Sequence, residues 1–183
     1  MNDRQITKSR NAIKLAFLDL LSEKDLEQIT IQDISDRANI GRRTFYYHYQ
    51  DKYDLLSSVL QEHIDELHHI CKDSSKNNEY MTAEYSLGWF DYFEKNHQFF
   101  STMLAGKGTT YFRSHFLSFV MDELQASIQL TSDKNNGIDA EIYFRFFGNA
   151  IVGIIEAYFA GDIKMSAKEM ARQVDILFSR NIY

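Results

Sequence analysis

Proline is absent from this sequence of 183 residues, and cysteine and tryptophan each occur once. Because proline makes up roughly 5% of an average protein, its absence favours a chain of helices whose breaks are made by Gly, Asn and Ser. The single cysteine, Cys71, excludes an internal disulfide and fits a reducing compartment. No continuous apolar run reaches about 18 residues, so we expect no membrane-spanning helix. The N-terminus lacks the apolar segment of a signal peptide, and we expect a cytoplasmic protein.

The net charge of −6 is distributed unequally along the chain. Residues 1–53 hold nine Lys and Arg against eight Asp and Glu, whereas the remainder holds eleven against eighteen. Arg4, Lys8, Arg10 and Lys14 lie close together near the N-terminus, where an arm or a first helix could contact DNA phosphates or a minor groove. A frayed polar terminus explains each of these residues equally well. The acidity of the second part therefore does not exclude a first part that binds nucleic acid.

The residue patterns typical of enzymes are missing from the sequence. His63, His68 and His69 lack the i, i+4 pairing with a nearby Glu that a helical zinc site uses, and they fit a polar helix face. The sequence has no Gly-rich phosphate loop, no Gly-x-Ser-x-Gly turn and no paired cysteines. We therefore expect no catalytic residues, no metal site and no cofactor.

The segment from Thr30 to Lys52 has the pattern of two short helices joined by a tight turn. Thr30 and Asp33 are spaced to form a capping box that opens the first helix, in which apolar residues then recur at helical spacing. Asn39-Ile40-Gly41 ends that helix, because Asn and Gly tolerate the left-handed conformation. A second short helix is expected over Arg42–His48.

The second short helix places unusual side chains on its outer faces. Phe45 and Tyr49 are four residues apart and can pack inward, which leaves outward Arg42, Arg43, Thr44, Tyr46, Tyr47 and His48. Arginine can bind guanine edges with two hydrogen bonds, hydroxyl groups can bind phosphates, and aromatic rings can contact thymine methyl groups. Lys52 lies beside the N-terminus of the next helix, where a phosphate is favoured. The segment therefore predicts a DNA-binding helix-turn-helix, and an ordinary pair of packed helices is the less favoured alternative.

The same residues resemble the N-terminal domain of TetR/AcrR-family transcriptional regulators. The similarity covers about the first third of the chain and is carried by Ile29-Thr30, Ile34, Ala38-Asn39-Ile40-Gly41, Thr44-Phe45-Tyr46-Tyr47-His48-Tyr49 and Asp51-Lys52. The resemblance implies a DNA-facing set that consists of Thr30, Gln32, Arg42, Arg43, Thr44, Tyr46, Tyr47, His48 and Lys52. Two residues depart from the family pattern: Gly41 stands where many members carry a capping Ser or Thr, and Arg43 stands where many carry a small residue. The first weakens the cap of the recognition helix, and the second adds a group able to recognise bases.

Helical spacing continues along the rest of the chain. Apolar periodicity predicts a first helix over residues 5–23, a long connecting helix over 52–73, and further helices over 80–95, 97–105, 108–130, 138–160 and 166–181. We therefore expect an all-α fold of about nine helices. A three-helix, helix-turn-helix DNA-binding domain occupies residues 1–50, and a larger helical ligand-binding and dimerisation domain occupies residues 51–183.

Aromatic side chains are concentrated in the second part, since residues 54–183 contain 20 of the 26. An aromatic core is the simplest explanation of any single ring. So many bulky rings rarely fill a small bundle without a gap, and a mostly apolar cavity is the usual form of a small-molecule site. The residues expected to line a pocket for a small apolar or aromatic effector are Trp89, Tyr92, Phe93, Phe112, Phe116, Tyr143 and Phe147.

Small residues recur at spacings of three and four on the helix expected over 138–160. Such a face has little side-chain bulk, so another helix can approach it closely. In the resembled family, the last two helices meet their copies across a twofold axis and form a four-helix bundle. Packing inside one subunit explains the pattern equally well. The expected dimer-interface residues are Ala150, Gly153, Ala157, Met170, Val174 and Leu177.

These patterns together predict a sequence-specific DNA-binding transcriptional regulator. We expect a repressor that acts as a homodimer on double-stranded operator DNA and is released by a small-molecule effector. The alternative is a DNA-binding regulator whose C-terminal domain docks a partner protein and activates transcription. A closed cavity among the aromatic rings favours the first hypothesis, and a filled core favours the second. Neither hypothesis involves a membrane.

Overall fold

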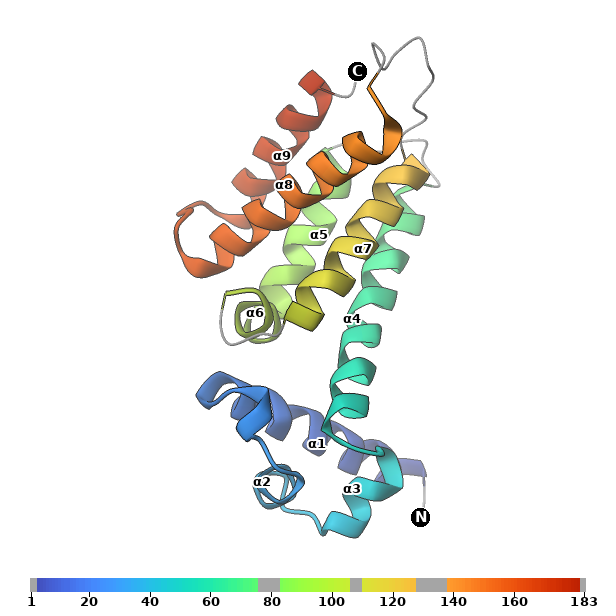
Figure 1. The fold of residues 1–183 in the computed structure, drawn as a ribbon, viewed down its shortest axis with the longest axis vertical. Coiled ribbons are helices and arrows are strands. Elements are labelled where there is room, and N and C mark those ends of the chain that lie inside the picture. The colour runs from blue at the N-terminus through green and yellow to red at the C-terminus, as the bar shows by residue number, and fades with distance from the viewer. Residues whose placement is uncertain (1–2, 76–82, 106–109, 128–137, 182–183) are drawn as a thin grey trace.

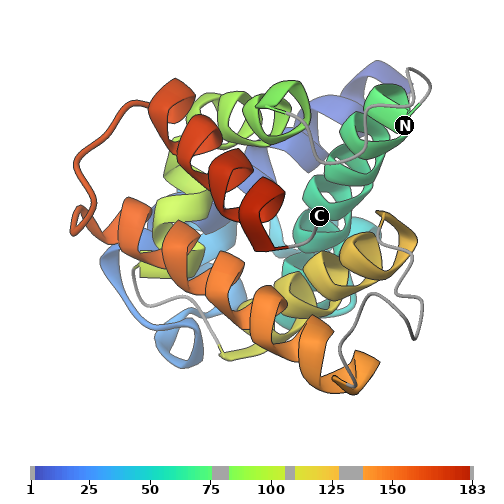
Figure 2. The same ribbon diagram turned by 90° about the horizontal axis from the view of Figure 1, so that it is seen from above.

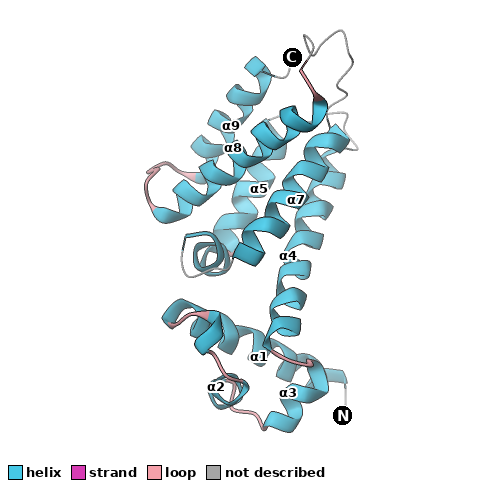
Figure 3. Cartoon of the chain, viewed as in Figure 1, coloured by secondary structure: helices cyan, strands magenta, loops and turns pink. Residues whose placement is uncertain are grey.

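The computed structural model describes residues 3–75, 83–105, 110–127 and 138–181. Over those ranges the chain forms helices joined by turns, which confirms the all-α prediction (Figure 1; Figure 3). In chain order the elements are α1 (Asp3–Glu23), the 3-10 turn η1 (Leu26–Gln28), α2 (Ile31–Arg37), α3 (Arg42–His48), α4 (Lys52–Ser75), α5 (Ala83–Lys95), α6 (His97–Phe100), the π-helical turn η2 (Ser101–Ala105), α7 (Thr110–Ser127), α8 (Ala140–Ala160) and α9 (Ala167–Asn181).

The first three helices lie together at one end of the molecule, and α4 runs from them into the remaining helices (Figure 1). Ile13, Phe17 and Leu21 form the buried face of α1 and belong to the same core as Phe45 of α3. Complete burial of one such side chain contributes about 1.5–3 kcal/mol, so this core stabilises the packing of the first three helices. The predicted domain boundary at residue 50 falls in the turn between α3 and α4.

The helix ends differ from the predicted ones in a few places. α1 begins at Asp3, and α4 continues to Ser75. The helix predicted over residues 97–105 is divided, because α6 ends at Phe100 and the chain continues as the π-helical turn η2. A π turn shifts the register of the helix, and both Phe100 before the shift and Met103 after it are buried. Both parts of this segment therefore face the core.

The C-terminal helices pack around an aromatic core. α9 packs on α5 and α8 packs on α7, so that α8 and α9 lie over the other two helices in the view of Figure 2. The rings of Phe93 and Phe100 are fully buried, with their centroids 4.7 Å apart. Gly148 permits the close approach of α8 to α7, because a Cβ atom at this position would lie 2.9 Å from Cγ of Met121.

α8 has apolar side chains on more than one face. Among the described residues, α8 is the one helix long enough and apolar enough, with a mean hydropathy of 1.2, to cross a membrane by length and composition alone. Phe144, Val152 and Ile155 point into the core, whereas Ile142 and Phe146 are 64% and 67% exposed. The second apolar face of α8 is therefore not covered by the described part of the chain.

Candidate nucleic-acid interface

Local hydrogen bonds build the turn between α2 and α3. The Thr30 hydroxyl accepts a hydrogen bond from the Asp33 amide at 3.1 Å, and the Asp33 carboxylate accepts one from the Thr30 amide at 2.8 Å, which confirms the predicted capping box. Asn39 follows α2 with a φ of 53°, a left-handed conformation that asparagine tolerates. The Ile40 amide then donates to the Ser35 carbonyl at 2.9 Å. These bonds end α2 and set the direction in which α3 begins.

α3 has a buried side and an exposed side. Phe45 is fully buried, whereas Tyr46 and Tyr47 expose 56% and 60% of their surfaces. Arg42 and Arg43 are exposed as well. Two rings and two guanidinium groups thus lie together on the solvent side of one two-turn helix. This is the composition of a surface that contacts phosphates and base edges.

The end of α3 is less accessible than the sequence suggests. His48 is half-buried, and its Nε2 lies 2.7 Å from the Ser9 hydroxyl of α1. Burial, together with the charge of Arg10, lowers the pKa of His48. The adjacent Tyr49 is buried, and its hydroxyl accepts a hydrogen bond from Arg10 at 3.3 Å. His48 is therefore less accessible than an outward position on α3 suggests, because α1 crosses this end of α3; Thr44 is also half-buried.

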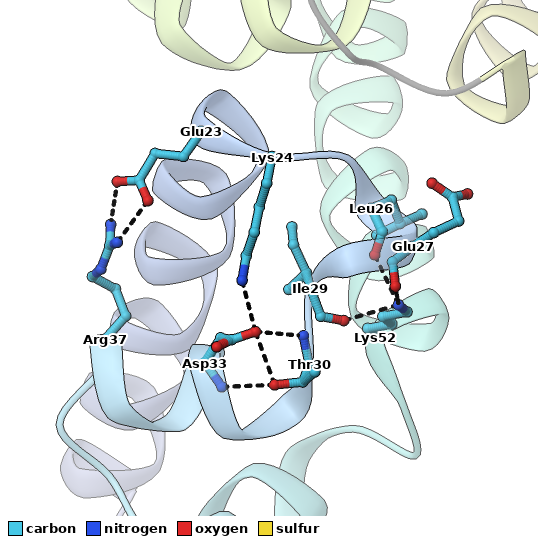
Figure 4. Close-up of polar contacts among 9 residues, drawn as sticks. All are labelled: Glu23, Lys24, Leu26, Glu27, Ile29, Thr30, Asp33, Arg37 and Lys52. Carbon is cyan, nitrogen blue, oxygen red and sulfur yellow. Dashed lines mark hydrogen bonds and ion pairs between the residues drawn. The ribbon is translucent and has the colours of Figure 1, made fainter.

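Other residues of the predicted DNA-facing set bind groups within the protein. Gln32 stays exposed but donates to the Asp36 carboxylate at 2.7 Å. The Thr30 hydroxyl is used in the cap of α2. Lys52 turns back toward the segment between α1 and α2, where its ammonium group donates to three backbone carbonyls (Figure 4). The ammonium group of Lys52 is therefore bonded to carbonyls of the protein itself, whereas a phosphate contact requires a free ammonium group.

The basic residues of α1 also divide into two groups. Lys14 forms an ion pair with Glu62 of α4, and Arg10 lies 3.7 Å from the same carboxylate. Arg4 and Lys8 are exposed on the first turns of α1. Of the four predicted basic residues, Arg4 and Lys8 therefore remain candidates for DNA contact, whereas Arg10 and Lys14 connect α1 to α4.

An exposed, basic and aromatic second helix in a helix-turn-helix is the arrangement of a DNA-recognition helix. A family model described as "Bacterial regulatory proteins, tetR family" matches residues 16–59, and one described as "Transcriptional regulator C-terminal region" matches residues 82–180. The chain belongs to the TetR family. It is a DNA-binding transcriptional regulator of a family that is not enzymatic.

Similar proteins agree with this assignment. The uncharacterized HTH-type transcriptional regulator YxbF of Bacillus subtilis (strain 168) is 41% identical over 83 residues, which are 45% of this TetR-family chain and 22% of YxbF. The dhaKLM operon transcriptional activator DhaS of Lactococcus lactis subsp. lactis (strain IL1403) is 33% identical over 67 residues, 37% of this chain and 36% of DhaS. The matched parts thus span well under two thirds of either relative. The crystal structure of a TetR transcriptional regulator from Streptococcus agalactiae 2603V has 28% identity and a TM-score of 0.72, with 96% of both chains covered.

Four residues of the predicted effector pocket lie in the core of this TetR-family regulator. Trp89, Phe93, Phe112 and Phe116 are each at most 8% exposed. Phe112 and Phe116 are stacked with centroids 5.6 Å apart, and Phe93 lies 6.2 Å from Trp89 and 6.1 Å from Phe116. These rings contact one another at the centroid distances of ordinary aromatic pairs.

The other three residues of the predicted pocket are half-buried. The Tyr92 hydroxyl lies 2.8 Å from Nδ1 of His63, whose ring stacks on Phe99 with a centroid distance of 3.7 Å. Burial lowers the pKa of His63 to about 4 and raises that of Tyr92 to about 12, so both are neutral near pH 7. Tyr143 and Phe147 pair with each other on α8 at 4.6 Å. The predicted set is therefore divided between the aromatic core, a half-buried contact between α4 and α5, and α8.

The predicted dimer-interface residues on α8 lie on its accessible side. Ala150 is exposed, and Gly153 and Ala157 are half-buried. A Cβ atom at Gly153 would meet nothing within 4 Å among the described residues. On α9, Leu177 is 48% exposed. These positions are available to a second copy of the chain.

Two predicted interface residues on α9 are buried in the subunit itself. Met170 and Val174 are 2% and 8% exposed, because this side of α9 packs against α5. Met170 is therefore a core residue and not an interface residue. Val174 forms the floor of a surface groove between α8 and α9.

The groove includes Phe146, a large side chain that neither predicted set contains, and Phe147, which was expected in the effector pocket. The groove has a volume of about 290 Å³ and is lined by Phe146, Phe147, Ala150, Ile151, Ile154, Val174 and Leu177. Ile142, Phe146 and Ala150 follow each other at a spacing of four, so they continue one face of α8. Extending the small-residue face toward the start of the helix would have identified Phe146.

Proposed function

We propose that this regulator acts as a homodimer whose two α3 helices bind one operator. The observation that carries the proposal is the exposed apolar face of α8 and α9. Phe146 and Leu177, which line the groove between the two helices, expose 67% and 48% of their surfaces. Ile142, one turn before Phe146 on α8, exposes 64%. Scattered apolar residues are ordinary on a protein surface, but a contiguous group marks an interaction site. A second copy related by a twofold axis would cover this face with the same face.

Recognition of DNA gives an independent reason for two copies. α3 is only seven residues long. It offers a few base contacts of about 1–3 kcal/mol each, so two copies about 34 Å apart on successive major grooves double the specific contacts. The exposed side chains proposed to make these contacts are Arg42, Arg43, Tyr46 and Tyr47, with Thr44 and Gln32 at the edge of the surface.

We propose further that the dimer represses transcription in the cytoplasm. Occupation of promoter DNA by a dimer is sufficient to block transcription, whereas activation needs a further contact with the transcription machinery. A small apolar or aromatic effector that binds better to a dimer with a different spacing of its α3 helices would release the operator. The direct connection of α3 to the aromatic domain through α4 supports this proposal (Figure 1).

Selection of duplexes from a random-sequence library tests the dimeric operator. The expected product is an inverted repeat whose half-sites are separated by about one helical turn or a multiple of it. Sedimentation of the complex should give two protein chains per duplex. A selected sequence without twofold symmetry, bound by a single chain, would contradict the proposal.

A second candidate is a regulator whose C-terminal domain docks a partner protein and activates transcription. The dense packing of Trp89, Phe93, Phe112 and Phe116 favours it, and the similar protein DhaS is named an activator. Transcription in a purified system from a promoter carrying the selected sequence distinguishes the two candidates. Repression by the protein alone supports the first, and activation that depends on a second protein supports the other.

A further inference from the structure

Lys52, the first residue of α4, is held inside the DNA-binding domain. Its Nζ donates to the carbonyl oxygens of Leu26 at 2.7 Å, Glu27 at 3.0 Å and Ile29 at 2.8 Å (Figure 4). An ammonium group has three hydrogens, so these three bonds use all of them. The three carbonyls belong to η1 and the residue after it, in the segment that joins α1 to α2. Lys52 therefore connects the start of α4 to a segment more than twenty residues earlier.

α2, which follows this segment, is held by ion pairs from Glu23 at the end of α1 and from Lys24 directly after it. Lys24 donates to the Asp33 carboxylate at 2.8 Å, and this bond, with those from Thr30, lowers the pKa of Asp33 to about 2. At the other end of α2, Arg37 donates to both oxygens of Glu23 at 2.9 and 2.8 Å (Figure 4). α2 is thus tied to α1 at both ends, and Lys52 adds the connection to α4.

We propose that Lys52 is a positioning residue for DNA recognition and does not bind phosphate. It fixes residues 26–29, and with them α2 and α3, in one orientation relative to α4. Specific contacts require both α3 helices of a dimer to enter their grooves in a defined orientation. Loss of the three hydrogen bonds loosens that orientation and lowers specific affinity, while the number of ionic contacts to DNA stays the same. The proposal rests on DNA binding by α3.

The salt dependence of binding distinguishes positioning from phosphate contact. The probe is a duplex selected by the wild-type protein from a random-sequence library. We expect Lys52→Met to weaken binding by about tenfold, equivalent to about 1.4 kcal/mol, with no change in the slope of log K against log salt concentration. A phosphate contact would instead lower that slope by about 0.9, and this result would overturn the proposal. Lys168→Met, which removes an exposed lysine of α9, is the matched control and should change neither quantity.

Lys52→Arg provides a second, charge-conserving test. A planar guanidinium group is larger than an ammonium group and cannot direct its hydrogens to three carbonyls that surround one point. We therefore expect Lys52→Arg to lose affinity as Lys52→Met does, again with an unchanged slope. Arginine is a good phosphate ligand, so full retention of affinity in this variant would contradict the positioning role.

Hydrogen exchange without DNA measures directly how well the three Lys52 hydrogen bonds hold residues 26–29. The amides of Gln28 and Ile29 donate to the carbonyls of Asp25 and Leu26 in the turn that Lys52 binds. We expect their protection to fall about tenfold in both Lys52 variants, while amides in the middle of α8 keep theirs. Unchanged protection would overturn the proposal whatever the DNA measurements give. If Lys52→Met does not fold, Lys52→Arg carries the test, with circular dichroism as the check that its helices form.

Discussion

Replacement of Phe146 by alanine tests the proposed dimer most directly. Phe146 exposes 67% of its surface on the accessible face of α8. A phenylalanine side chain can bury about 150–250 Å², so covering its exposed part removes about 130 Å² of apolar surface in each subunit. At about 25 cal/mol per Å², this burial contributes about 3 kcal/mol per subunit and about 6 kcal/mol per dimer. Alanine retains only a small part of that contribution.

We expect Phe146→Ala to raise the dissociation constant of the dimer by at least about 100-fold, because the costs of association reduce the value obtained from area alone. Sedimentation equilibrium over a dilution series measures this constant. The stability of the separated subunit should change by less than about 0.5 kcal/mol, since the side chain is exposed there. Tyr53→Ala removes a ring that is 51% exposed on α4, away from the α8 and α9 face, and serves as the matched control with an unchanged constant. An equally tight dimer of Phe146→Ala would refute the assignment of this face.

Three further predictions concern α3, α8 and the aromatic core. Replacing Tyr47 or Arg42 with alanine should weaken binding of a selected duplex by about 1–3 kcal/mol in fluorescence anisotropy while the melting temperature stays the same, and unchanged affinity would remove that residue from the contact surface. Gly153→Leu should give a stable monomer in sedimentation, because nothing lies within 4 Å of a Cβ atom at this position. Gly148→Leu should instead lose about 1–3 kcal/mol of folding stability, because its Cβ atom would lie 2.9 Å from Met121. A Gly153→Leu variant less stable than Gly148→Leu would contradict the packing described. Burial lowers the pKa of His63 from 6.5 to about 4, so between these values the unfolded chain binds more protons and stability should fall as the pH falls. His63→Gln should flatten this part of a melting-temperature profile. Identical profiles for the wild type and His63→Gln would argue against a neutral buried His63.

The parts of the fold that depend on local spacing could be predicted from the sequence. The capping box of Thr30 and Asp33 involves residues three apart, and the buried position of Phe45 follows from helical periodicity. The partners of Lys52 and His48 lie 23 to 39 residues away in the chain, so no local pattern reveals them. Both side chains were therefore expected at the surface, where an isolated short helix would place them.

The C-terminal domain shows the same limit at the level of helix orientation. Periodicity identifies an apolar stripe on α9 but does not say whether α5 or a second subunit covers it. The structure places Met170 against the core and leaves Leu177 accessible. The rotation of α9 about its own axis decides between these roles, and it depends on how α9 packs against α5. The sequence likewise gives the number of aromatic rings, but it does not give the orientation of the helices that carry them. Whether the rings fill a core or line a cavity therefore could not be predicted.

Two neighbouring residues of α4 contact different parts of the molecule. Glu62 forms an ion pair with Lys14 of α1, whereas His63 stacks on Phe99 of the aromatic core at 3.7 Å. A rearrangement of the core that displaces Phe99 therefore acts on α4 one residue from the contact that holds α1. Because Lys52 joins the start of α4 to the segment before α2, a tilt of α4 would carry the first three helices with it as one body. In a dimer, equal tilts in both subunits would change the distance between the two α3 helices, which converts a small change in core packing into a change in operator affinity.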